Sequence, residues 1–328
     1  MELVTAADVE RLLPFDQCIA VIHEAMLRFS QDKHPQPLRN VMPLGVGSAF
    51  GVMPGRLSGT GYFGAKVVSV FSTPSGHQRH QGFVLLFDGA DGAPVRIADA
   101  EAITSIRTAA ATAVATEALA RPDAGRLAIF GCGLQAAAHL AALTAVRRYD
   151  EIMVWGRSPD RLRHFVRAQS EKLGLILHGI DDAETVARRA DVICTVTSSP
   201  SPILLGRWVQ KGAHVNLVGS SVPGPSEVDS ALVAMARFFV DSRPSAEAQA
   251  AEYRIALEEG AIGPSHIAGE IGEVLAGIRP GRMGPDDVTV YKSLGLIVQD
   301  LAAIEHIHRR LQAEEQLGAS TPAAAHTP

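Results

Sequence analysis

A short glycine-rich turn near the middle of the chain has the residue types that bind a pyrophosphate. The apolar run 126–130 leads into Gly131 and Gly133, and an alanine-rich helix is predicted over about 135–146. Gly131 permits the tight turn, and Gly133 lets the backbone approach the phosphates. The first N–H groups of the helix and its positive dipole end then face the anion. Ala136 stands at the third glycine position of G-x-G-x-x-G, where a small residue still allows close helix–strand packing.

The sequence around this turn alternates strands and helices. Apolar strand-like runs recur at 151–155, 191–197 and 214–219, with helical segments between the earlier ones. This alternation predicts an α/β fold with a doubly wound parallel sheet, which binds ligands at the carboxyl ends of its strands. A sheet without a nucleotide is the alternative, and the position of the turn within this pattern favours a dinucleotide site.

The residues after the run 151–155 favour NADP(H) as the cofactor. An NAD site usually has Asp or Glu here, which accepts a hydrogen bond from the ribose 2′-hydroxyl. This chain has Gly156 and Arg157 instead, with Ser158 and Arg161 close behind. A guanidinium pairs well with a 2′-phosphate. NAD(H) stays an alternative, since Arg157 is equally compatible with a solvated surface charge.

The overall composition is that of an ordinary globular protein and excludes several partners. A chain of 328 residues can hold two domains. A net charge of −5 gives no electrostatic reason to bind nucleic acid or an anionic membrane, and no apolar run is long enough to span a bilayer. The three cysteines fall in apolar contexts, which predicts reduced thiols in a cytoplasmic protein. With no CxxC pair and no HExxH, we expect no metal site.

The first third of the chain differs from the alternating middle. A helix is predicted over 15–29, and a strand-rich region of about sixty residues follows. Its strand-like runs are 40–44, 50–53, 63–71, 82–87 and 94–98. A long helix over about 100–119 then leads across 121–123, where a Pro and an Asp predict a domain boundary.

The last third is predicted to be helical and loop-like after Asp241. The run 288–295 is a strand that enters a final helix ending near Gln316, and we expect this helix to pack back on the N-terminal domain. Residues 318–328 are rich in Ala, Thr and Pro, which predicts a disordered tail.

Several separated motifs between residues 3 and 315 resemble the ornithine cyclodeaminase/mu-crystallin family. They are Pro37-Leu38-Arg39, 51–54, Gly64-Ala65-Lys66, Gln81 with 84–87, 104–110, the glycine turn 131–136, 191–197, 212–216, 272–274 and 292–295. The resemblance implies a smaller α+β substrate-binding and dimerisation domain (1–120), completed by the helix 296–317, and a Rossmann NAD(P)-binding domain (121–295). It also implies a homodimer in which the β-rich domains pair.

The resemblance assigns functional positions as well. Arg39, Lys66 and Arg107 match basic substrate-binding positions, and Leu294 matches a substrate-side position. Three cations from three elements can hold an α-carboxylate and position the adjacent carbon. Arg107 is the best candidate, because an unpaired charge among its small apolar neighbours would be costly. Cofactor-contact positions are matched by Thr108, Leu134, Gln135, Thr195, Thr197, Gly219 and Ser293, which join Gly131, Gly133, Ala136, Arg157, Ser158 and Arg161 from the motifs above.

One departure from the family pattern bears on the chemistry. Cyclodeaminases of this family carry an Asp in the loop after the fourth strand, where it acts on the substrate amine, and the matching residue here is Ser221. A serine hydroxyl without an activating partner is a poor base at neutral pH. Reduction of a ready-made cyclic imine needs no such base, because the nitrogen can arrive protonated. We therefore expect Ser221 to hydrogen-bond the ring nitrogen, and Lys66 to help polarise the C=N bond.

These observations predict an NAD(P)H-dependent reductase of a small cyclic imine carboxylate, such as Δ1-pyrroline-2-carboxylate or Δ1-piperideine-2-carboxylate. The product would be the cyclic L-amino acid, proline or pipecolate. Three alternatives stay open: an ornithine or lysine cyclodeaminase that uses another base, an amino-acid dehydrogenase or opine-type reductase with a linear substrate, and a protein that binds NADPH and a small ligand without turnover.

Overall fold

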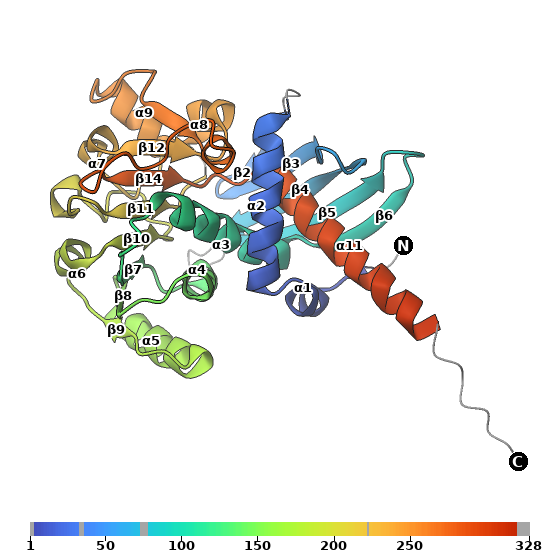
Figure 1. Ribbon diagram of the computed structural model, residues 1–328, viewed down its shortest axis with the longest axis horizontal. Coiled ribbons are helices and arrows are strands. Elements are labelled where there is room, and N and C mark those ends of the chain that lie inside the picture. The colour runs from blue at the N-terminus through green and yellow to red at the C-terminus, as the bar shows by residue number, and fades with distance from the viewer. Residues whose placement is uncertain (1–2, 33–35, 73–77, 222, 320–328) are drawn as a thin grey trace, which may run out of the picture.

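The computed structural model describes residues 3–32, 36–72, 78–221 and 223–319, and its strands form two separate sheets (Figure 1). Within the described residues the smaller sheet has six strands, of which β1 pairs in parallel with β6 and the others are antiparallel. In spatial order they are β1 (Leu3–Val4), β6 (Pro94–Asp99), β5 (Gln78–Asp88), β4 (Tyr62–Ser72), β3 (Ser48–Arg56) and β2 (Asn40–Gly45).

The larger sheet has eight described strands, and all of its pairings are parallel. In spatial order they are β13 (Ile267–Glu270), β12 (Arg237–Val240), β14 (Thr289–Lys292), β11 (His214–Leu217), β10 (Val192–Thr195), β7 (Arg126–Phe130), β8 (Glu151–Trp155) and β9 (His178–Gly179). The strand order reverses between β7 and β10, which is where doubly wound sheets bind their ligands. The predicted fold class is confirmed.

Helices cover these sheets in the manner that their apolar faces require. Those packed with the smaller sheet are α1 (Ala6–Leu12), α2 (Phe15–Gln31), α3 (Ala100–Leu119) and α11 (Ile297–Ala319). Those around the larger sheet are α4 (Leu134–Val146), α5 (Pro159–Leu173), α6 (Ala183–Arg189), the 3-10 turn η1 (Gly206–Trp208), α7 (Ser230–Met235), α8 (Arg243–Gln249), α9 (Ala251–Glu258) and α10 (Ile271–Leu275). Helix α11 crosses α2 beside the smaller sheet (Figure 1), so the last helix belongs to the core of the first domain.

One face of the smaller sheet is packed and the other is open. On β5 the side chains of Val84 and Leu86 are fully buried, whereas that of Phe83 is 44% exposed. This alternation follows from the two-residue period of a strand. Other large apolar side chains exposed on this domain include Val41, Met42, Leu44, Val46, Phe63 and Phe71.

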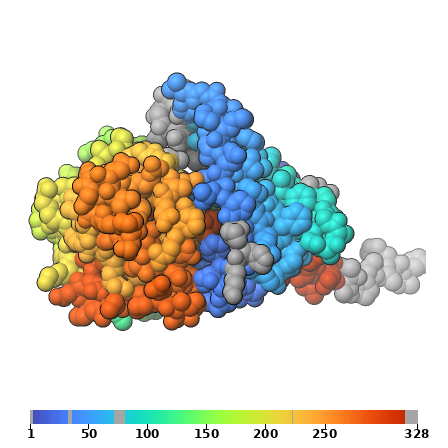
Figure 2. All heavy atoms as spheres, turned by 90° about the horizontal axis from the view of Figure 1, so that it is seen from above, coloured from blue at the N-terminus to red at the C-terminus, as the bar shows by residue number. Residues whose placement is uncertain are grey.

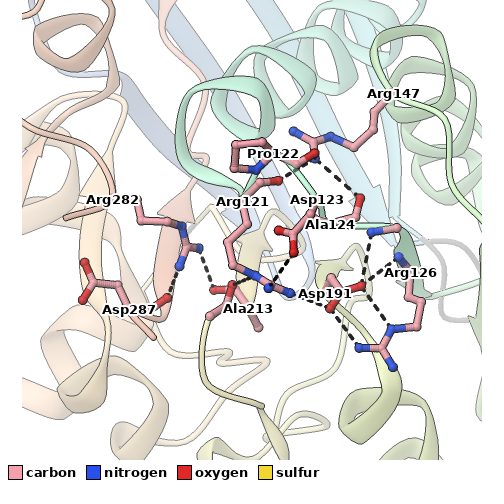
Figure 3. A network of polar contacts seen from close by, with 12 residues as sticks. Arg121, Pro122, Asp123, Ala124, Arg126, Arg147, Asp191, Ala213, Arg282 and Asp287 are labelled. Carbon is pink, nitrogen blue, oxygen red and sulfur yellow. Dashed lines mark hydrogen bonds and ion pairs between the residues drawn. The ribbon is translucent and has the colours of Figure 1, made fainter. Parts of the chain in front are cut away.

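A network of ion pairs fixes the chain where it passes from α3 to β7 (Figure 3). Asp191 accepts hydrogen bonds from Arg121 Nη2 at 2.9 Å and from Arg126 Nη2 at 3.0 Å. Although burial disfavours its charged form, the Arg126 guanidinium holds the pKa of Asp191 below its usual value. Arg121 also donates to the Gly212 carbonyl at 3.1 Å, and Arg147 donates to the Arg121 carbonyl at 2.6 Å. The junction is thus held at the amino ends of the parallel strands, opposite the ligand-binding edge.

Two predictions for the last third of the chain were wrong. Residues 267–270 form β13 rather than a helix or loop, because pairing with β12 at the sheet edge supplies the strand conformation. Their sequence, Ile-Ala-Gly-Glu, has little strand propensity of its own. The predicted tail also begins too early, since α11 continues through Ala319. The rest of that tail, 320–328, lies outside the described residues.

Candidate functional site

The glycine turn leaves open space at the amino end of α4. Gly131 has a φ of +136°, which a residue with a side chain rarely adopts. Gly133 is the N-cap of α4 with no side-chain hydrogen bond to the first turn, and a Cβ built there meets no atom within 4 Å. Next to it, Leu134 is 60% exposed. The first N–H groups of α4 therefore face an open cradle, which fits the pyrophosphate of a dinucleotide.

The residues expected near the adenosine ribose lie beside this cradle. Arg157 and Arg161 are exposed at the start of α5, and Ser158 is its N-cap. Neither arginine has an acidic partner among the residues that the structure describes. Arg161 lies close enough to oppose the burial that raises the pKa of the Cys132 thiol to about 11. That thiol fills the space above Gly156, where a Cβ would lie 2.5 Å from Cys132 Sγ.

A buried carboxylate, Glu227, draws together the loops that follow β10 and β11. It accepts hydrogen bonds from Thr195 Oγ1 at 2.7 Å, from Thr197 N at 2.6 Å and Oγ1 at 2.7 Å, and from Gly219 N at 2.8 Å. Burial raises the pKa of Glu227, and these donors and the Lys292 charge oppose that rise. Three predicted cofactor-contact residues thus share one carboxylate, which sequence reasoning missed because Glu227 lies in an irregular loop.

A buried ion pair contacts the loop that carries Ser221. Lys292 at the end of β14 donates to the Ser220 carbonyl at 2.6 Å and to Glu252 Oε1 at 3.0 Å. The side chains of Lys292 and Glu252 are fully buried. Ser221 itself is half-buried at the carboxyl edge of the sheet. This arrangement fixes the backbone beside Ser221.

Lys66 and Arg107 come together on one carboxylate. Lys66 on β4 is 5% exposed and Arg107 on α3 is 4% exposed. Lys66 Nζ lies 3.1 Å and Arg107 Nε lies 3.0 Å from the same oxygen, Asp300 Oδ1. Lys66 Nζ also donates to Thr104 Oγ1 at 2.5 Å, and Arg107 Nη1 donates to Gln299 Oε1 at 2.9 Å. We call Arg39, Lys66, Arg107 and Asp300 the basic cluster.

Arg39 joins the cluster from the segment before β2. Its Nη2 donates to the carbonyls of Leu294 at 2.5 Å and Gly295 at 3.0 Å. Burial and the Arg107 charge lower the pKa of Arg39, while Asp300 and Asp241 oppose them. The N–H groups of Leu294 and Gly295 both donate to Asp241 Oδ2 at 2.7 Å. The turn after β14 is therefore bound on one side by Arg39 of the first domain and on the other by Asp241, which follows β12 of the larger sheet.

Asp241, Gln299 and Asp300 are functional candidates that sequence reasoning missed. A Gln-Asp pair between apolar residues in the first turn of a buried helix was the available signal for two of them. Asp300 is fully buried. Burial disfavours its charge, but Arg107 and Lys66 hold the pKa of Asp300 below its usual value.

A hollow of about 230 Å³ opens beside the basic cluster, between elements of both domains. Its lining includes Arg39, Met53, Ser242, Glu270 and Gly295. The two domains meet along one seam in Figure 2, where the orange surface of the larger-sheet domain faces the blue surface of the first. A small ligand can reach the edge of the basic cluster through such an opening.

Most of the predicted cofactor-contact residues lie along the carboxyl edge of the larger sheet. Arg157 and Ser158 follow β8, Gly131 follows β7, Thr195 belongs to β10, and Ser293 follows β14. Thr108 is buried on α3, one position beyond Arg107. The arrangement extends across five adjacent strands, from the ribose-side arginines to the basic cluster. Among the described residues, no group of three His, Cys, Asp or Glu side chains could hold a metal ion.

This fold and this edge define a class of protein: a two-domain α/β protein with a dinucleotide-binding sheet and a separate domain that carries a buried basic cluster. The model of the ornithine cyclodeaminase/mu-crystallin family matches residues 1–315. The chain belongs to that family, as its motifs had indicated.

Curated and solved relatives agree with this assignment. The chain is 30% identical over 315 residues to a Δ1-pyrroline-2-carboxylate reductase of Bacillus cereus, with 94% of this chain and 96% of the relative covered. It is 35% identical over 279 residues to the ketimine reductase mu-crystallin of Mus musculus, with 83% and 84% covered. The structure of Thermococcus litoralis Δ1-pyrroline-2-carboxylate reductase in complex with NADH and L-proline has a TM-score of 0.92 at 29% identity, with 96% and 98% covered.

Among the described residues, no helix combines the length and the apolar composition needed to cross a membrane.

Proposed function

We propose that this protein reduces a small cyclic imine carboxylate to the cyclic L-amino acid, with a reduced nicotinamide dinucleotide as hydride donor. The observation that carries the proposal is the basic cluster itself. Among the described residues, Lys66 has two acceptors for its three N–H protons, and Arg39 donates only through Nη2. Arg107 leaves Nη2 without a partner there. Each cation keeps a donor for a ligand, which is what a carboxylate needs.

The residues of the chain have separable tasks in this reaction. Arg39, Lys66 and Arg107 bind the carboxylate and so orient the adjacent imine carbon. A reduced nicotinamide, held at the glycine turn, would supply the hydride for the new C–H bond, and the C=N π pair would move to nitrogen. Lys66, as a nearby ammonium, favours this movement of charge, and the Ser221 hydroxyl hydrogen-bonds the ring nitrogen, which carries its proton on arrival.

Ser221 favours reduction over cyclodeamination. Removal of an amine from ornithine or lysine requires a base at that position, and a serine hydroxyl does not serve unless a histidine or carboxylate activates it. Within the part of the chain that the structure describes, Ser221 has no hydrogen bond to such a group. The Bacillus cereus and Mus musculus relatives are a Δ1-pyrroline-2-carboxylate reductase and a ketimine reductase, which supports the same direction of reaction. The L-proline bound to the Thermococcus litoralis protein supports a five-membered ring product.

The cofactor proposed here is NADP(H) rather than NAD(H). Arg157 and Arg161 are exposed and lack acidic partners among the described residues, and no carboxylate follows β8 at Gly156. A 2′-phosphate would supply the missing anion for both guanidiniums. The Thermococcus litoralis relative was solved with NADH, so NAD(H) stays the alternative cofactor.

The test of the proposed function is a cofactor-oxidation screen. We expect NADPH to be consumed with Δ1-pyrroline-2-carboxylate or Δ1-piperideine-2-carboxylate, with proline or pipecolate as the product. The screen includes 2-oxo acids with amines and, with oxidised cofactor, ornithine. Ammonia and proline from ornithine, with neither imine reduced, would reject the assignment in favour of a cyclodeaminase. Tight NADPH binding without any turnover would instead indicate a ligand-binding protein.

We also propose that the protein forms a homodimer through the smaller sheet. Val41 is 47% exposed, Met42 is 53% exposed and Val46 is fully exposed. The blue atoms of this part of the chain project from the body in Figure 2. Exposed apolar side chains grouped in this way are typical of a protein interface. In sedimentation velocity we expect a dimer for the native chain and a monomer for Val41→Asp/Met42→Asp; a native monomer would refute this assembly.

A further inference from the structure

The ammonium of Lys66 has a fixed orientation, and the structure shows what fixes it. An ammonium has three N–H donors in a tetrahedral arrangement. Two of them are taken by Thr104 Oγ1 on α3, at 2.5 Å, and by Asp300 Oδ1 on α11, at 3.1 Å. The Thr104 hydroxyl is itself oriented, because it donates to the Ala100 carbonyl at 2.5 Å. Two fixed acceptors therefore determine where the third N–H of Lys66 points.

Asp300 differs from Thr104 because it is an anion and because it also holds Arg107. Its Oδ1 accepts from both cations, whereas Oδ2 is buried and has no hydrogen-bond partner among the described residues. A fully buried carboxylate destabilises a protein unless it is paired with a cation. The charged form of Asp300 therefore depends on Lys66 and Arg107. Asp300 lies on α11, the last helix of the chain, which packs in the core of the first domain. It is 234 positions from Lys66 in the sequence.

On this basis, and resting on the proposed function, we propose that Asp300 is the positioning residue of the basic cluster. It holds Lys66 and Arg107 in place and keeps Lys66 charged, so that the third N–H of Lys66 is available to the substrate. Asp300 acts through Lys66 and Arg107 and is not itself a catalytic residue.

The charges around Lys66 make this role necessary. Burial lowers the pKa of Lys66, and the charges of Arg107 on α3 and Arg39 before β2 lower it as well, so that the net pKa is about 8. Asp300 on α11 is the group that opposes them. These three are the charged side chains with the largest effect on the pKa of Lys66. Without Asp300, the ammonium would face two guanidiniums in a buried site and would lose its proton at a lower pH.

The direct test is the titration of Lys66 by NMR in the whole protein with 13C-labelled lysine. The chain has five lysines, and the Lys66 signal is the one absent from Lys66→Arg. We expect Lys66 to titrate near pH 8 in the native protein and at least about one pH unit lower in Asp300→Asn. The matched control is Glu305→Gln, which neutralises a carboxylate on the same helix that pairs with Arg309 instead. An unchanged Lys66 titration in Asp300→Asn would overturn the proposal.

Two further measurements keep the proposal testable. If Asp300→Asn does not fold, Asp300→Glu retains the anion, and its Lys66 must titrate within about half a pH unit of the native value. In the kinetics, the fall of kcat/KM for the imine at high pH should move to lower pH in Asp300→Asn by the same amount as the NMR titration. Absence of imine reduction by the native protein would reject the proposed function alone, because the NMR titration does not depend on turnover.

Discussion

Gly295 lies directly against the guanidinium of Arg107. A Cβ at position 295 would lie 2.5 Å from Arg107 Nη1 and 2.8 Å from Nη2, and the φ of Gly295 is +78°. The turn after β14 therefore approaches the basic cluster more closely than a side chain would allow. The same turn supplies the carbonyls that orient Arg39. The turn that contains Gly295 thus contacts both Arg39 and Arg107 of the basic cluster.

Gly295→Ala should displace Arg107 and weaken substrate binding. We expect the affinity for L-proline to fall by at least about 10-fold, which corresponds to about 1.4 kcal/mol. Isothermal titration calorimetry measures it. The control is Gly277→Ala, since Gly277 has a φ of +69° but a Cβ there meets no atom within 4 Å. Gly277→Ala therefore introduces the same kind of backbone strain as Gly295→Ala but no contact with another side chain. Equal losses of affinity in the two variants would show that the Arg107 contact is irrelevant.

Arg107→Ala should strongly impair substrate use while NADPH affinity stays nearly unchanged. Removal of a charge-assisted hydrogen bond to a carboxylate costs about 1.5–3 kcal/mol, so kcat/KM for the imine should fall by at least about 10-fold to 100-fold. Arg107→Lys, which keeps the charge without the planar fork, should lose less. Steady-state kinetics and fluorescence titration of NADPH measure the two effects. Parallel losses in substrate use and NADPH affinity would mean that Arg107 is misassigned.

Arg157→Asp should shift the cofactor preference toward NADH. The new carboxylate would repel a 2′-phosphate and could accept from a ribose 2′-hydroxyl. We expect the ratio of kcat/KM for NADPH over NADH to fall by at least about 10-fold. Arg163→Asp, an exposed substitution on the same helix, is the control, because Arg163 pairs with Asp160 at the surface. A ratio unchanged in Arg157→Asp would refute contact with the 2′-phosphate.

Glu227→Gln should destabilise the protein and loosen the cofactor edge. The amide offers one acceptor oxygen where the carboxylate has two, and its NH2 group would face the donors of Thr195, Thr197 or Gly219. We expect the free energy of unfolding to fall by about 3 kcal/mol, as measured by urea denaturation. Glu184→Gln, which breaks a surface pair with Arg188, should change it by less than about 1 kcal/mol. If Glu227→Gln lost no more stability than Glu184→Gln, Glu227 would not be needed to hold the loops after β10 and β11 together.

Two buried histidines predict a loss of stability in mild acid. Burial lowers the pKa of His139 to about 4 and that of His214 to about 3. Unfolded histidines titrate near about 6.5, so below that pH the unfolded chain binds protons that the folded protein does not. Their contribution is complete above about pH 6.5 and declines as the pH falls toward the folded values. Each of the two histidines should lower the free energy of unfolding by about 2 kcal/mol at pH 5 relative to pH 7.5.

Urea denaturation of His139→Gln at both pH values measures this contribution. His139 donates from Nδ1 to the Gln135 carbonyl at 2.8 Å, which glutamine can partly replace. The variant should lose less stability between pH 7.5 and 5 than the native protein, by about 2 kcal/mol. His178→Gln, at an exposed position, should match the native protein. If His139→Gln retained the full loss, the acid sensitivity would arise from other groups.

Much of the larger sheet could be predicted from the sequence because its signals are local. A strand, a glycine turn and a helix occupy consecutive residues around Gly131, and their conformations depend on neighbours along the chain. The helix Ala100–Leu119 has the bounds that its periodicity predicted. The strand β13 was not predictable in this way, because its four residues adopt the extended conformation only beside β12.

The sequence by itself determined which residues are available for binding. They are the glycines of a turn that suits a pyrophosphate, the arginines after β8, and three cations of the kind that bind a carboxylate. Only the tertiary structure decided that Asp300 joins Lys66 across 234 positions and Arg107 across 193, and that Glu227 gathers two strand ends. The conformation of a helix, strand or turn depends largely on residues that are close in the sequence. The partner of a buried charge depends instead on how elements distant in the sequence pack together. The pairing of these charges therefore appears first in the folded molecule.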